Sequence, residues 1–88
     1  MMSNHLAAAL NLAPVIERVH GAHHPELTRV RELTERIPHA ADATETAEIF
    51  RELRAETNDY AIPEDACEAF TETYRSLAAA DKAHQARV

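Results

Sequence analysis

The stretch that decides the fold is residues 63–84, PEDACEAFTETYRSLAAADKAH. Good helix formers dominate it, and a proline followed by two acidic residues, Pro63, Glu64 and Asp65, is typical of a first helical turn. Side chains that recur every three or four residues form one face of such a helix. They are Cys67, Phe70, Tyr74, Leu77, Asp81, His84 and Val88. We therefore predict a helix from Pro63 towards the C-terminus, whose inner stripe becomes polar near its end.

The first residues of the chain predict a second helix, which ends near His20. Its apolar stripe recurs at helical spacing and comprises Leu6, Leu10, Ala13, Ile16 and His20, widened by Leu12, Val15 and Val19. Pro14 lies within it, so either the helix kinks there or its regular part begins there. Gly21 follows at a position that suits a helix C-terminus.

Two more helical segments lie between these. One opens with Pro25 and Glu26 and ends at Pro38, and its inward side chains are Leu27, Val30, Leu33 and Ile37. The other begins at Asp42, which can cap the helix while Glu45 reaches back in a capping box. Its inner stripe is Ala47, Phe50 and Leu53, and it stops around residues 57–60, TNDY. The expected fold is all-α, a small antiparallel bundle of three to four helices in a single domain, residues 1–88.

Composition restricts the classes of partner. The formal net charge is −6 and the nine basic residues are interleaved with acidic ones, whereas duplex DNA and anionic membranes need a concentrated basic face. Nothing in the chain approaches a membrane span, and a single cysteine excludes an internal disulfide and suits a reducing compartment. We expect a cytoplasmic protein that binds neither nucleic acid nor membrane.

The core is expected to be lean. Much of the 45% apolar content is alanine, and large core formers are few. Small domains recover the ordering entropy of their chain only narrowly. Burial against a second copy would add apolar contacts, so we predict a homodimer.

The histidines of VHGAHHPEL, residues 19–27, pose the question of a metal site. His20 and His24 would lie one turn apart if the helix continued, which is how helical histidines share a metal. Gly21 and Pro25 make that continuation unfavourable. We therefore interpret the stretch as a turn between two helices.

Acid and histidine pairs three residues apart occur twice, at His39 with Asp42 and at Asp81 with His84. This spacing places both side chains on one side of a helix, as in bundle-type di-iron sites. Asp42 already serves as a helix cap, and His39 lies at a junction. Asp81 and His84 share the inner stripe, where they form either a metal pair or a solvated helix end.

Cys67 can be a nucleophile activated by a helix N-terminus, or a core thiol. Its place at the head of the Phe70 and Tyr74 stripe favours the buried core thiol. No nucleophile, base and orienting acid occur at useful spacing, and no glycine-rich phosphate loop is present. We therefore assign no catalytic and no cofactor-binding residue, and we expect no enzyme activity.

Two blocks of the chain resemble the hemerythrin-like di-iron proteins that repair iron–sulfur clusters. They are VIERVHGAHHPELTRVRELTERI, residues 15–37, and IFRELRAETNDYAIPEDACEAFTETYRSL, residues 49–77. The most specific element is PEDAC followed by Tyr74. The resemblance implies a helical bundle with iron ligands on four helices and a role in iron–sulfur cluster repair.

The ligand pattern of that family is depleted here. Ala43 stands where the acid partner of His39 belongs, and no glutamate follows His84. The helix that should bring the first ligand histidine is absent. The resemblance therefore predicts a non-enzymatic binding or assembly module with no cofactor, whose protein partner the sequence does not name.

Two alternatives stay open. In the first, two copies bring His84, Asp81, His39 and His20 together to bind iron at a shared site. In the second, joint protonation of the histidines at positions 20, 23 and 24 makes the module sensitive to pH.

Overall fold

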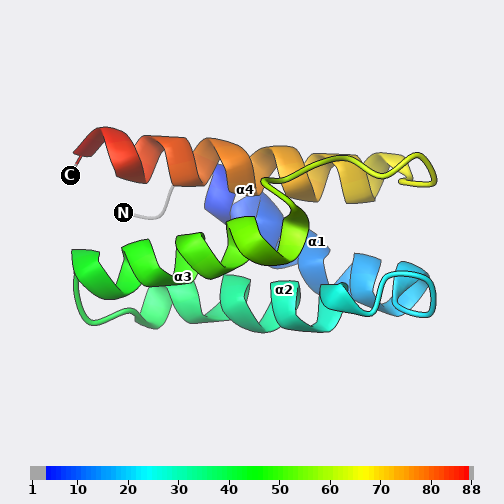
Figure 1. Cartoon of the computed structure of the whole chain (residues 1–88), viewed down its shortest axis with the longest axis horizontal. Helices are drawn as coiled ribbons and strands as arrows, with labels where there is room; N and C mark the ends of the chain where they lie inside the picture. The colour runs from blue at the N-terminus through cyan, green and yellow to red at the C-terminus, as the bar shows by residue number, and fades with distance from the viewer. Residues whose placement is uncertain (1–3, 88) are drawn as a thin grey trace.

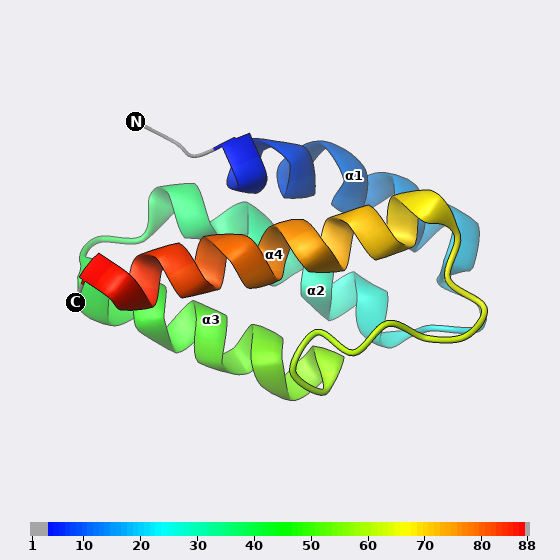
Figure 2. The ribbon, with the colours of Figure 1, turned by 90° about the horizontal axis from the view of Figure 1, so that it is seen from above.

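Helices account for most of residues 4–87, the part of the chain that the computed structural model describes (Figure 1). They are α1 (Asn4–His20), α2 (Glu26–Arg36), the 3₁₀ turn η1 (Ile37–His39), α3 (Ala43–Thr57) and α4 (Glu68–Arg87). No strand occurs within this range. Consecutive helices run in opposite directions, as Figure 2 shows from above. The predicted all-α helical bundle is confirmed, and Val88, the last member of the predicted stripe, lies outside the described residues.

One apolar cluster joins all four helices. Its members include Leu6 and Ile16 of α1, Leu33 of α2, Leu53 of α3 and Leu77 of α4. The radius of gyration, 12.0 Å, equals the value of about 12 Å expected for a packed chain of this length. None of the helices within residues 4–87 combines the length and hydropathy that a bilayer crossing requires.

Helix α1 continues on both sides of Pro14, so its regular part does not begin at that residue. The N–H of Gly21 donates to the carbonyl oxygen of Glu17 at 2.9 Å just beyond the helix end, as the sequence predicts. A β-carbon at position 21 would collide with that oxygen, which is why the position needs glycine. Val19 does not widen the buried face, because its side chain is 63% exposed.

The predicted cap of α3 is present. The Glu45 N–H donates to Oδ1 of Asp42 at 2.9 Å, and Oε1 of Glu45 accepts from the N–H of Ala41 at 3.1 Å. The return bond reaches the residue before the cap rather than the cap itself. The inner stripe differs at one position, since Ala47 is exposed and Ile49 is buried in its place.

Helix α4 begins at Glu68, five residues later than the proline signal predicts. Residues 63–66 instead form a turn closed by the Ala66 N–H and the Pro63 carbonyl oxygen, 3.1 Å apart. Cys67 precedes the first helical turn, so the inner stripe starts at Phe70 rather than at the thiol. The prediction of a buried core thiol is wrong: Cys67 is exposed.

Ion pairs link each helix to the next. Glu17 of α1 pairs with Arg31 of α2 at 2.6 Å, and Arg29 of α2 pairs with Glu52 of α3 at 3.0 Å. Arg54 of α3 pairs with Asp81 of α4 at 2.6 Å. Helix α4 packs mainly on α1 and helix α3 mainly on α2. Helices α3 and α4 are joined by this last ion pair, by the rings of Phe50 and His84, and by the shared apolar cluster.

Candidate functional site

The connection between α3 and α4, residues 58–67, starts in an unusual conformation. Asn58, Asp59 and Tyr60 all have positive φ, at 54°, 61° and 62°. Asparagine and aspartate tolerate this left-handed region, but a bulky residue such as tyrosine enters it at a cost in free energy. Tyr60 is held there because its N–H donates to Oγ1 of Thr57 at 2.8 Å. The turn directs the tyrosine ring back towards α4.

Asp81 is the first anchor of this connection. The Tyr60 hydroxyl donates to Oδ2 of Asp81 at 2.8 Å, and Nη1 of Arg54 donates to both carboxylate oxygens at 2.7 and 2.6 Å. Nε2 of Gln85 donates to Oδ1 at 2.9 Å. Burial and the bond to Asp81 raise the pKa of the Tyr60 hydroxyl, so it stays protonated and remains a donor. The prediction of a solvated helix end is wrong, because Asp81 is 2% exposed.

His24 is the second anchor. Its Nε2 lies 2.9 and 3.0 Å from the two carboxylate oxygens of Asp65, and its Nδ1 lies 3.0 Å from Oε2 of Glu26. The bonds to Asp65 and then to Glu26 raise the pKa of His24. In turn the imidazole lowers the pKa of Asp65. The turn interpretation of VHGAHHPEL is confirmed, and one of its histidines fastens the α3–α4 connection to the start of α2.

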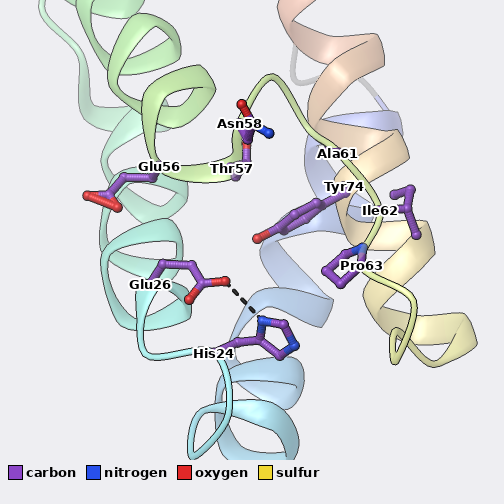
Figure 3. Close-up of a pocket in the computed structure, with 9 residues that line it drawn as sticks. All are labelled: His24, Glu26, Glu56, Thr57, Asn58, Ala61, Ile62, Pro63 and Tyr74. Carbon is purple, nitrogen blue, oxygen red and sulfur yellow. Dashed lines mark hydrogen bonds and ion pairs between the residues drawn. The ribbon is translucent and has the colours of Figure 1, made fainter.

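Between the two anchors lies a pocket of about 230 Å³. Figure 3 shows its lining, which comes from the α1–α2 turn, α2, the end of α3, the connection and α4. The lining residues are His24, Glu26, Glu56, Thr57, Asn58, Ala61, Ile62, Pro63 and Tyr74. Because the connection is fixed on both sides, the pocket is formed before any ligand arrives.

Tyr74 spans this pocket. In Figure 3 its ring extends from α4 beneath the connection, and its hydroxyl points to the side where Glu26 lies. The residue is 2% exposed, yet within residues 4–87 its hydroxyl has no hydrogen-bond partner. Burial, and then the negative charges of Glu26 and Glu56, raise the pKa of this hydroxyl. The pocket therefore contains a protonated hydroxyl group with both its donor and its acceptor capacity unused.

The two walls of the pocket differ in polarity. Glu26 brings its carboxylate to one side, whereas the carboxylate of Glu56, on the same side, points away from Tyr74 in Figure 3 and has no ion-pair or hydrogen-bond partner among the described residues. On the opposite side stand Ile62, which is 42% exposed, and Pro63. The pocket can thus receive a group with a polar end and an apolar stem.

A thiol and an imidazole meet outside this pocket. Nε2 of His20 lies 3.1 Å from Sγ of Cys67, and the rings of His20 and His24 both contact the ring of Phe70 edge-on, at 5.3 and 5.1 Å between centroids. Among the described residues no carboxylate accepts a hydrogen bond from His20. This pair therefore lacks the orienting acid that a nucleophilic triad uses.

The four candidate metal ligands are not brought together within one chain. His20 contacts Cys67, His39 lies exposed in η1, and Asp81 is occupied by the three donors described above. His84 packs its ring on Phe50 at 5.7 Å, with Nε2 buried and unpartnered. Within residues 4–87 no three side chains of the His, Cys, Asp and Glu types are placed to hold a metal ion. The side chains of one chain do not fit the di-iron centre that the resemblance implies.

Sequence reasoning missed the pocket because each lining residue had a simpler explanation. Tyr74 fitted the inner stripe of a helix, Glu26 a first helical turn, and Ile62 a short connection. The one usable signal is the tyrosine itself, because a buried tyrosine hydroxyl usually has a partner. No sequence pattern shows that the partner is missing.

Comparisons of the chain with protein-family models, curated proteins and solved structures find no match. The resemblance to the iron–sulfur cluster repair bundle thus stays a prediction. Any statement about function rests on the geometry of the chain itself.

Proposed function

We propose that this chain is a non-enzymatic helical binding module whose ligand site is the pocket beneath the α3–α4 connection. The observation that carries the proposal is the free Tyr74 hydroxyl at the centre of a preformed pocket. The hydroxyl is not sealed from water, since among the described residues the fully buried side-chain atom without a partner is Nε2 of His84. A ligand that bonds to the Tyr74 hydroxyl would replace water in a partly enclosed site.

The size of the pocket supports a small occupant. Its volume of about 230 Å³ is below the range of roughly 300–1,000 Å³ typical of cofactor and drug-sized ligand sites. A single side chain of a partner protein or a molecule of similar size suits that volume. No covalent step is part of the proposal, since the pocket lining contains no serine, cysteine or lysine.

The proposal is tested by NMR on the full ¹⁵N-labelled chain with four small probes of different charge and polarity. These are butylguanidinium, butyramide, butyrate and isobutanol. At least one probe should shift the amide signals of Thr57, Ala61, Ile62 and Tyr74 in a saturable manner. The hollow formed by Leu12, Glu68, Ala69 and Glu72 serves as an internal control. If all four probes leave the pocket signals unchanged, the pocket is not a ligand site and the proposal fails.

A further inference from the structure

Three properties of the pocket favour the same kind of ligand. Glu26 and Glu56 both line the pocket, and their negative charges add to the effect of burial in raising the pKa of the Tyr74 hydroxyl. The phenol oxygen is a free acceptor, and Ile62 offers an apolar surface opposite. A positively charged head on an aliphatic stem matches all three, because long basic side chains bury their methylene groups while the charged end stays with polar partners.

We propose that the pocket binds the arginine side chain of a protein partner, with the guanidinium between Glu26 and the Tyr74 hydroxyl and its stem along Ile62 and Pro63. This inference rests on the proposed function and specifies the ligand of the same site. Glu56, which is exposed and has no partner in the described part of the chain, attracts the incoming cation.

The arrangement of acceptors favours guanidinium over ammonium. Glu26 and the Tyr74 hydroxyl approach from different elements, α2 and α4. Oε2 of Glu26 is already 3.0 Å from Nδ1 of His24, whose pKa is raised, so an entering cation lies beside a second basic group and relies on Oε1 of Glu26 and on Glu56 for charge pairing. A guanidinium has five N–H donors in a plane and can bond to several separated acceptors at once, whereas an ammonium is a compact point charge. The net charge of −6 adds a long-range attraction for a basic segment.

The exposure of Ile62 favours a protein over a free small cation. Its side chain is 42% exposed beside the pocket, and it is one of two large hydrophobic residues with such exposure within the described chain. Residues that flank an inserted arginine would cover this apolar surface. A small guanidinium compound that fills only the pocket would leave it in water.

The test compares matched probes on the full-length chain. An acetylated and amidated Ala-Arg-Ala tripeptide is titrated and followed by NMR, beside the same tripeptide with citrulline, which has the shape of arginine without its charge. A lysine tripeptide and butylguanidinium complete the series. We expect the arginine tripeptide to bind about tenfold more tightly than the citrulline tripeptide, with lysine between them and butylguanidinium weaker than the arginine tripeptide.

Substitutions test which residues contribute to binding of the arginine side chain. Glu56→Gln should weaken binding of the arginine tripeptide roughly threefold to tenfold, while Glu64→Gln, an equal charge change on the same connection outside the pocket lining, should leave it within about twofold. Tyr74→Phe should weaken binding and leave the helical circular dichroism signal unchanged, because the lost hydroxyl has no partner among residues 4–87.

Each contrary result overturns one part of the proposal: the charge of the ligand, the protein nature of the partner or the location of the site. Equal affinity for citrulline and arginine removes the cationic ligand but leaves the pocket as a binding site. Butylguanidinium binding as tightly as the tripeptide removes the protein partner in favour of a small cation. Arginine-induced shifts confined to residues outside the pocket lining reject the site for this ligand, even when one of the neutral probes still binds there.

Discussion

Asp81 accepts four hydrogen bonds from the side chains of Arg54, Tyr60 and Gln85 while it is almost fully buried. Removal of one member of a buried ion pair leaves the other charge without compensation, which typically costs about 3–5 kcal/mol. Arg54 is 34% exposed, so it can turn partly to water and the loss is smaller.

We therefore expect Asp81→Ala to lower the free energy of unfolding by about 2–3 kcal/mol. Urea denaturation followed by circular dichroism measures this change. Glu64→Ala is the control, because its carboxylate is exposed and has no partner among the described residues, and its effect should stay within about 0.5 kcal/mol. Equal losses in the two variants would show that the Asp81 network does not stabilise the fold.

At the scale of elements, the His24 and Asp65 pair couples the α1–α2 turn to the α3–α4 connection. The folded state raises the pKa of His24 above its ordinary 6.5, so this contribution to stability is present below pH 6.5 and declines as the pH rises through the raised value. The pKa of Asp65 is lowered from 3.8, so its contribution is present above pH 3.8 and is lost as the pH falls through the lowered value.

The pair thus stabilises the fold most between pH 3.8 and 6.5. We expect the stability difference between the natural chain and Asp65→Asn to be larger at about pH 5.5 than at about pH 8.5. Thermal unfolding at both pH values measures that difference, with Glu64→Gln as a control that should show no such trend. A difference that grows towards alkaline pH would contradict the assignment of His24 as the protonated partner.

The helix boundaries agree with the sequence prediction wherever nearby residues alone determine them. Asp42 caps α3 through a bond to a residue three positions later, and Gly21 ends α1 at a position where a β-carbon would collide with the preceding turn. The Pro63 signal misled because residues 63–66 are tied to a distant element: His24 holds Asp65 across 41 positions. A contact between residues so far apart in the sequence leaves no signal in the helix propensity of residues 63–66.

The same difference between local and long-range contacts explains how much of the candidate site the sequence could predict. Phe70, Tyr74, Leu77 and Asp81 share one face of α4 as their spacing predicts, and all four are buried. Whether a buried polar group on that face finds a partner depends on the neighbouring helix. Asp81 meets Arg54, whereas the Tyr74 hydroxyl meets an open pocket, and spacing within α4 could not distinguish the two.

At the scale of the whole molecule, the apolar cluster of the four helices includes none of the candidate metal ligands. We therefore expect the helical circular dichroism signal to be unchanged when a chelator is added. Dialysis against EDTA followed by far-ultraviolet spectra tests this. A loss of helicity would mean that metal binding contributes to folding and would restore the iron site shared between two copies as the leading hypothesis.

Self-association should be measured together with metal content, because a shared metal site and a lean core both predict a dimer. Sedimentation equilibrium measures the mass of the assembly, and elemental analysis of protein expressed with added iron measures its metal content. Together they distinguish a dimer held by metal from a dimer that buries apolar surface. A dimer without iron, unchanged by EDTA, is the result expected when apolar surface such as Val19 joins two copies, and Val19→Asp should then shift the equilibrium towards monomer. Stoichiometric iron that His84→Ala removes would instead assign the association to metal, since Nε2 of His84 is buried without a partner among the described residues of one chain. A stable monomer would reject the dimer but leave the Tyr74 pocket intact, because the pocket is lined by residues of a single chain.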